Sequence, residues 1–147
     1  MGFQICNGVL KKYTEEKGVT EIVIPDGVQR IGERAFSGCD NITNVTIPDS
    51  VTSICNSVFA KCNNLTSVTI PDSVTSISDS AFESCSNLTS VTIPNSVTSI
   101  GNGAFQECIN LASVTIPVSI TSISDNAFFE CNNLKAVIFL LLLSLRL

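Results

Sequence analysis

The chain has 147 residues, which fits one domain, and 44% of them are hydrophobic while 14% are charged. This composition supports a buried core and excludes a disordered linker. The formal net charge is −5, and the one basic cluster, Lys11, Lys12 and Lys17, is interrupted by Glu15 and Glu16. These charges argue against nucleic-acid binding, which needs a clustered positive surface.

The first 18 residues predict a β-hairpin. Two partly apolar segments, Phe3 to Cys6 and Val9 to Tyr13, flank the pair Asn7-Gly8, which favours a two-residue type I′ turn. The charged residues that follow keep this part of the chain polar. We therefore expect residues 1–18 to form an N-terminal hairpin cap that shields the following core from water.

The start of the sequence shows no targeting signal. Residues 1–6 lack the basic region and the apolar stretch of a signal peptide. Gly2 would permit N-myristoylation, but the motif needs Ser or Thr at position 6, where this chain has Cys6. These residues alone leave the compartment open.

A 23-residue period governs the chain from residue 19 onward. Five columns of identical residues recur at this interval without an insertion, which predicts five repeats over residues 19–139. The columns are Pro25, Pro48, Pro71, Pro94 and Pro117; Ile31, Ile54, Ile77, Ile100 and Ile123; Phe36, Phe59, Phe82, Phe105 and Phe128; Cys39, Cys62, Cys85, Cys108 and Cys131; and Asn41, Asn64, Asn87, Asn110 and Asn133. One unit cannot bury its apolar face alone, so stacked units must share a core.

Each repeat begins with a short strand. In the unit that spans residues 65–87, Val68 and Ile70 alternate with Ser67 and Thr69. This period of two predicts a strand with one buried face. Pro71 ends the strand because proline cannot donate a ladder hydrogen bond.

The second half of the unit predicts a turn or a short helix. Val74 and Ile77 lie three residues apart, which indicates a turn or a short helical bend. Ala81, Phe82 and Cys85 have helical spacing, and we expect their side chains to point inward.

The repeat pattern Leu-x-x-Val-x-Ile-Pro-x-x-Val-x-x-Ile-x-x-x-Ala-Phe-x-x-Cys closely resembles the BspA-like leucine-rich repeats, from about Val19 to Phe139. The resemblance implies a leucine-rich-repeat solenoid with short parallel strands on one face and turns or short helices on the other. That family is associated with surface proteins of gut and oral bacteria and of some parasitic protists. It implies a cell-surface or extracellular location, and adhesion to protein partners such as host extracellular-matrix or cell-surface glycoproteins.

This chain departs from the wider leucine-rich-repeat consensus at the position that usually carries a ladder of asparagines. Ser50, Ser73, Ser96 and Ser119 stand there, with Gly27 in the first copy. We expect other groups to supply the hydrogen bonds of that ladder.

The residue types exclude most catalytic chemistry. The chain has no histidine, which removes Ser-His-Asp and Cys-His catalysis and histidine-based zinc sites. It also lacks a glycine-rich phosphate loop and an EF-hand pattern. We predict a non-enzymatic protein with no catalytic, cofactor-binding or metal-binding residues.

The seven cysteines have two interpretations. A metal or redox ladder would need close pairs such as Cys-x-x-Cys, whereas the closest pair here is Cys55 and Cys62. A stack of small buried thiols beside the phenylalanine column is the favoured interpretation. Cys6 and Cys55 lie outside the column, and they are the candidates for exposed, reactive thiols.

A short acidic column follows the prolines. Asp26, Asp49 and Asp72 form it, and Asn95 and Val118 break it. A cation site is one interpretation, and turn chemistry is the favoured one.

The outward face of the strands is the candidate ligand-contact surface. Solenoids often bind partners on their strand side, although Thr also simply suits an exposed strand. Ice binding is a remote alternative function, because the regular hydroxyl rows resemble the threonine arrays of ice-binding solenoids. The candidate residues are Asn44, Thr46, Ser67, Thr69, Ser90, Thr92, Ser113 and Thr115.

The chain ends in an apolar tail, Leu140 to Leu147. The apolar stretch that begins at Ala136 is too short for a membrane-spanning helix, which needs about 20 residues. A strand edge that pairs with another chain is one interpretation, and a truncated reading frame is another. The first would suit a homo-oligomer or a filament built by end-to-end stacking. It is the structural alternative to a binding module.

Overall fold

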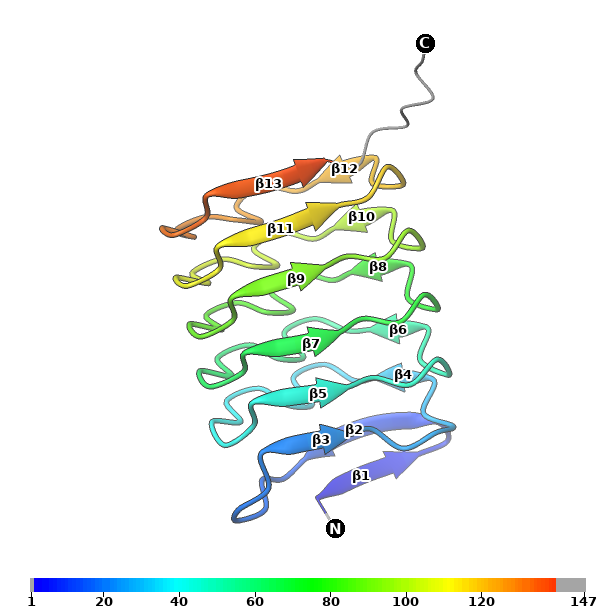
Figure 1. The fold of residues 1–147 in the computed structure, drawn as a ribbon. Coiled ribbons are helices and arrows are strands. Elements are labelled where there is room, and N and C mark those ends of the chain that lie inside the picture. Colours follow the sequence, from blue (N-terminus) through cyan, green and yellow to red (C-terminus); the bar gives the residue numbers. More distant parts are fainter. Residues whose placement is uncertain (1, 140–147) are drawn as a thin grey trace.

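The computed structural model describes residues 2–139, and it shows a stack of similar coils (Figure 1). Thirteen short strands lie in this part of the chain. They are β1 (Phe3–Cys6), β2 (Val9–Tyr13), β3 (Glu21–Val23), β4 (Arg30–Ile31), β5 (Asn44–Thr46), β6 (Ser53–Ile54), β7 (Ser67–Thr69), β8 (Ser76–Ile77), β9 (Ser90–Thr92), β10 (Ser99–Ile100), β11 (Ser113–Ile116), β12 (Ser122–Ile123) and β13 (Ala136–Phe139).

The predicted strands form one face of the solenoid. Parallel sheets of order β3-β5-β7 and β9-β11-β13 follow each other along the stack. Each residue pairs with the residue 23 positions later, as Val45 does with Val68 and Thr46 with Thr69. This register keeps every column in line, because the repeats contain no insertion.

The opposite side of each coil carries a second short strand. Sheets of order β1-β2-β4-β6 and β8-β10-β12 run there, and Ile77 of β8 pairs with Ile100 of β10. The prediction of a turn or helical bend ending at Ile77 was therefore wrong for that residue. A strand of two residues is too short to show a period of its own, and only stacking against the next coil defines it.

Turns, and no helices, connect the strands within residues 2–139. Ala81, Phe82 and Cys85 are buried as predicted, but the expected helical alternative was wrong. Ser80 precedes this segment and Ser84 lies within it, with φ values of 54° and 59°. A right-handed helix requires negative φ, so these left-handed residues prevent one from running through Cys85.

The left-handed positions recur in two columns, mostly without glycine. The first comprises Arg34, Ser57, Ser80, Gly103 and Asn126, and the second comprises Gly38, Lys61, Ser84, Glu107 and Glu130. Non-glycine residues rarely adopt positive φ. The bonds between neighbouring coils stabilise this conformation. For example, the Lys61 N–H donates to the Glu83 carbonyl at 2.7 Å.

A column of stacked aromatic rings forms the centre of the core. Neighbouring phenylalanine centroids lie 5.2–5.5 Å apart along the whole column. Phe36, Phe59, Phe82 and Phe105 are fully buried. Offset stacking at this distance adds to the hydrophobic gain of burying each ring.

The N-terminal hairpin is confirmed, and it also continues the repeat. β1 and β2 pair antiparallel, and Asn7 and Gly8 both have positive φ, as a type I′ turn requires. Tyr13 extends the aromatic column, since its ring lies 5.2 Å from that of Phe36. Phe3 then covers Tyr13, at 5.3 Å. The hairpin is therefore both an atypical first coil and the N-terminal cap of the core. At the other end of the chain, the predicted apolar tail, Leu140 to Leu147, lies outside the described residues.

The cysteine column is a ladder of free thiols, which are buried except for the half-buried Cys131. The Sγ atoms of Cys62, Cys85 and Cys108 each donate to a phenylalanine carbonyl of the preceding coil at 3.1 Å. Burial raises the pKa of Cys39 to about 11 and that of Cys108 to about 12. The interpretation as structural thiols is thus confirmed for this column.

An asparagine ladder does exist, but in the Asn41 column. The side chain of Asn87 donates to Asn64 at 3.3 Å, and Asn110 donates to Asn87 at 3.4 Å. The serines at the consensus ladder position are less well hydrogen-bonded. The hydroxyls of Ser73 and Ser96 are buried without a hydrogen-bond partner among the described residues.

Candidate functional site

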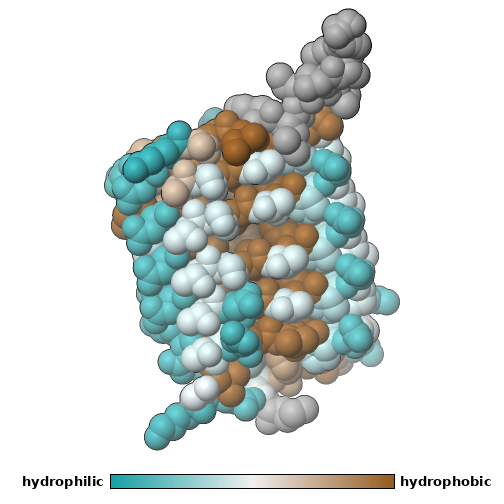
Figure 2. Space-filling view, viewed as in Figure 1, coloured by the Kyte–Doolittle hydropathy of each residue, from teal (hydrophilic) through white to brown (hydrophobic). Residues whose placement is uncertain are grey.

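The predicted contact residues lie on one face of the stack, which we call the strand face. It consists of Asn44, Thr46, Ser67, Thr69, Ser90, Thr92, Ser113 and Thr115, on β5, β7, β9 and β11. Five of these side chains are exposed, and the other three are half-buried. Figure 2 shows this side of the molecule largely in the pale colours of near-neutral hydropathy, with apolar patches between them.

Strand pairing fixes the spacing of this face. Parallel neighbours in a sheet lie roughly 4.8 Å apart. Asn44 pairs with Ser67 across β5 and β7, and Ser90 pairs with Ser113 across β9 and β11. The hydroxyls therefore form regular rows on a rigid backbone. Of these rows, Ser67 donates to Asn44 at 3.2 Å, and the other hydroxyls have no hydrogen-bond partner among residues 2–139.

The strand face contains a shallow depression of about 490 Å³. Five of the predicted residues line it, and Asn44, Thr46 and Ser113 lie outside it. Asp72 and Asn95, which follow the strands, also line it, together with Pro94. Sequence reasoning assigned these residues to turns. The repeat register alone shows that turn residues reach the same depression as the strands.

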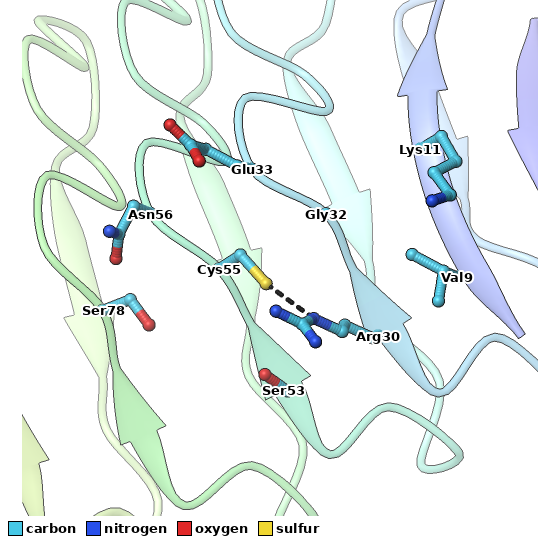
Figure 3. A pocket seen from close by; sticks show the side chains of 9 residues that line it. All are labelled: Val9, Lys11, Arg30, Gly32, Glu33, Ser53, Cys55, Asn56 and Ser78. Carbon is cyan, nitrogen blue, oxygen red and sulfur yellow. Dashed lines mark hydrogen bonds between the residues drawn. The ribbon is translucent and has the colours of Figure 1, made fainter.

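The opposite side of the solenoid holds a second depression, of about 570 Å³. Lys11, Arg30, Glu33 and Cys55 are among the residues that line it, as Figure 3 shows. The Nε atom of Arg30 donates to the Sγ atom of Cys55 at 3.0 Å. This hydrogen bond raises the pKa of the Arg30 guanidinium.

The two cysteines outside the column occupy different environments. Cys6 is exposed on β1, as anticipated, whereas Cys55 is half-buried beside Arg30. Within residues 2–139, no cluster of three or more Cys, Asp or Glu side chains could hold a metal ion. The same part of the chain contains no helix long and apolar enough to span a membrane.

These observations first define the class of protein. Short parallel strands, a 23-residue coil and columns of Leu, Ile, Val and Phe make this a leucine-rich-repeat solenoid. The family model for the BspA type leucine rich repeat region matches six copies over residues 11–135, and the chain belongs to that family. The matched range begins at residue 11, inside β2, and it holds one copy more than the five repeats predicted. The family and fold are typically non-enzymatic.

Solved structures of bacterial leucine-rich-repeat proteins share the fold. A leucine rich cell surface protein from Faecalibacterium prausnitzii is 34% identical, with a TM-score of 0.87 over 89% of this chain and 35% of that one. The Treponema pallidum leucine-rich-repeat protein TpLRR is 31% identical, with a TM-score of 0.73 over 88% of this chain and 73% of that one.

The pneumococcal vaccine antigen PcpA is 20% identical, with a TM-score of 0.81 over 93% of this chain and 34% of that one, and it shares the fold. This chain thus spans about a third of the Faecalibacterium protein and of PcpA. The search of curated proteins found no match.

Proposed function

We propose that this chain is a non-enzymatic, protein-binding module of a cell-surface protein, and that the strand face is its contact surface. One observation carries the proposal: five of the eight strand-face residues line a single depression, where the sheets β3-β5-β7 and β9-β11-β13 adjoin. Partners commonly dock on the strand side of a solenoid, where the backbone pays little entropy to present its side chains.

The chemistry of the face favours a polar protein or glycoprotein surface. Apart from Asp72, the residues around the depression are uncharged, and most of them carry hydroxyl or amide groups. Such groups exchange their hydrogen bonds to water for bonds to a partner, with a small net gain of about 0.5–1.5 kcal/mol for each bond. Host extracellular-matrix glycoproteins present suitable donors and acceptors.

The same chemistry limits the affinity of one copy. Strong hot spots at protein interfaces are usually Trp, Tyr or Arg. The chain has no Trp, and its single Tyr is buried in the core. We therefore expect weak binding by one chain, which several linked or clustered copies would strengthen.

A cell-surface location fits the comparisons. The Faecalibacterium relative, of which this chain spans about a third, is described as a leucine rich cell surface protein. An exposed solenoid of this kind would meet soluble or matrix proteins directly.

Biolayer interferometry against a panel of extracellular-matrix glycoproteins tests the proposal. The wild-type chain should bind at least one of them saturably. A Thr69→Glu, Thr92→Glu double variant, which places two charges in the depression, should weaken that binding by roughly tenfold or more, or about 1.4 kcal/mol.

The matched control adds the same charges on the opposite side. Ser53 and Ser76 are exposed on β6 and β8, so a Ser53→Glu, Ser76→Glu variant should bind like the wild type. Equal loss in both double variants would contradict the assignment of binding to the strand face. Absence of binding to the whole panel by folded protein would contradict the proposed class of partner.

A further inference from the structure

Arg30 and Cys55, in the depression opposite the strand face, both depart from the repeat. The later coils carry only small residues at these two positions. The column of Arg30 continues as Ser53, Ser76, Ser99 and Ser122, and that of Cys55 continues as Ser78, Gly101 and Ser124. The two departures meet in space, because the Nε atom of Arg30 donates to the Sγ atom of Cys55 at 3.0 Å. A thiol beside a guanidinium is therefore a local feature of this depression and not a property of the repeat.

The space beside the thiol is open towards a second cation. Lys11 lines the same depression from β2, which pairs with the strand of Arg30 (Figure 3). Gly32 lies between Lys11 and Cys55 in the stack. A Cβ atom at Gly32 would lie 3.0 Å from the Leu10 carbonyl oxygen, closer than an ordinary contact. The glycine thus leaves no side chain between the lysine and the thiol.

The charges around Cys55 favour an anion. Lys11 and Arg30 line the depression, and Glu33 is the one carboxylate among the described residues that line it. The Oε1 atom of Glu33 lies 4.0 Å from the Nε atom of Arg34, so a cation outside the depression offsets part of its charge. A concave surface with excess positive charge raises the local concentration of anions.

Cys55 combines access with a neighbouring cation, unlike the other described cysteines. The column thiols are buried except for Cys131, and the Sγ atom of Cys131 donates to the Phe105 carbonyl at 3.0 Å. Cys6 is exposed, but the hydrogen bond from Arg30 has no counterpart there within residues 2–139. Cys55 is half-buried and lines the depression.

We propose that Cys55 is a site of reversible modification, at which its thiol forms a mixed disulfide with a small disulfide that carries carboxylates. Cys55 releases its proton to water, and the thiolate attacks one sulfur of that disulfide. A bond forms between the Sγ atom and the attacked sulfur, the original S–S bond breaks, and the other half leaves as a thiolate that takes up a proton. The Cys55 sulfur is oxidised and the leaving half is reduced, so no further oxidant takes part.

The lining residues determine which disulfides react. Lys11 and Arg30 attract carboxylates, whereas a neutral or cationic disulfide gains nothing from them. Ser53 and Asn56 also line the depression and offer hydrogen bonds to polar groups. Its volume of about 570 Å³ lies within the range of roughly 300–1,000 Å³ that is usual for small-molecule sites. The site lies opposite the strand face, so the proposal does not depend on binding by that face.

Exchange rates of the full chain with reagents of different charge test the proposal. A Cys6→Ser chain reports on Cys55, a Cys55→Ser chain reports on Cys6, and peptide mass spectrometry identifies the modified residue. The ratio of the rate with anionic dithiobis(nitrobenzoate) to the rate with neutral dithiodipyridine should be about tenfold larger for Cys55 than for Cys6. Cationic cystamine should react more slowly with Cys55 than the neutral reagent does. About 1 M salt should remove these differences by screening.

Three substitutions in the Cys6→Ser chain assign the preference to the cluster. Arg30→Gln and Lys11→Gln should each lower the anionic-to-neutral ratio by roughly threefold, because each removes one charge from the depression. Lys12→Gln is the matched control, since it removes the same charge from the next position of β2, outside the lining. It should keep the ratio of the Cys6→Ser chain. Circular dichroism establishes that each variant is folded.

Three results would overturn the proposal. If Cys55 stays unmodified by every reagent while Cys6 reacts, its thiol is not accessible. An anionic-to-neutral ratio equal to that of Cys6 would exclude selection by charge. A preference that persists in the double Arg30→Gln, Lys11→Gln variant would place its origin outside the cluster.

Discussion

Phe82 and Phe128 occupy the same column, yet their surroundings differ. The ring of Phe82 stacks between those of Phe59 and Phe105, at 5.4 and 5.3 Å, and it is fully buried. Among the described residues, Phe128 has one ring neighbour, Phe105, at 5.5 Å, and it is only partly buried. Identical residues in near-identical coils therefore gain their burial from the neighbouring coils, and an inner coil has two of these.

The largest expected effect of this burial is a dependence of stability on pH, which arises from the cysteine column. Burial raises the pKa of Cys62, Cys85 and Cys108 above the ordinary value of 9.0. The folded state therefore favours the neutral thiol, and this stability is fully present below pH 9. Above that pH the unfolded chain releases protons first, and each inner thiol removes about 1.4 kcal/mol per pH unit until its folded pKa is reached.

Urea unfolding at several pH values measures this effect. The stability should stay level up to about pH 9 and then fall steeply. Cys85→Ala should reduce the steepness of the fall, whereas Cys6→Ser should not, because Cys6 is exposed. A slope that Cys85→Ala leaves unchanged would assign the alkaline loss to groups other than the inner thiols.

Replacing Phe82 and Phe128 by alanine compares an inner coil with the last described coil directly. Phe82→Ala removes a fully buried ring and should cost roughly 3–5 kcal/mol. Phe128→Ala removes a half-exposed ring and should cost about half as much or less. Unfolding by urea, with each variant at low concentration, gives both values. Equal costs would mean that the last coil is covered as well as the inner ones.

The asparagine ladder should give the smallest difference. Asn87 donates to Asn64 and accepts from Asn110, so Asn87→Ala breaks two exposed hydrogen bonds. We expect a loss of about 1 kcal/mol. Within residues 2–139, the Asn133 side chain makes one such bond, its donation to Asn110, and Asn133→Ala should cost less. The same unfolding assay decides this, and a larger loss at Asn133 would contradict the ladder as described.

The sequence predicts the parts of this fold that the 23-residue period carries. The strands at Val68 and its equivalents, the buried Phe and Cys columns and the Asn7-Gly8 hairpin are all present. Each depends on a local pattern or on a column of identical residues. The strand-face residues lie on β5, β7, β9 and β11, and alternation along each strand fixes the side to which they point.

The remaining features depend on contacts between coils, which no single unit contains. The two-residue strand at Ser76 and Ile77 exists only through pairing with its neighbours. Ser80 and Lys61 adopt left-handed conformations that their residue types do not predict. The Asn64–Asn87 bond was likewise missed, since a column of asparagines alone does not show which way its side chains turn.

Hydrogen exchange along the chain tests the central claim most directly. We predict slow exchange in the inner strands β6 to β10, because two neighbouring coils protect each of them. Exchange in β12 and β13 should be faster than in these inner strands. Equal protection of β13 and β9 would contradict the account.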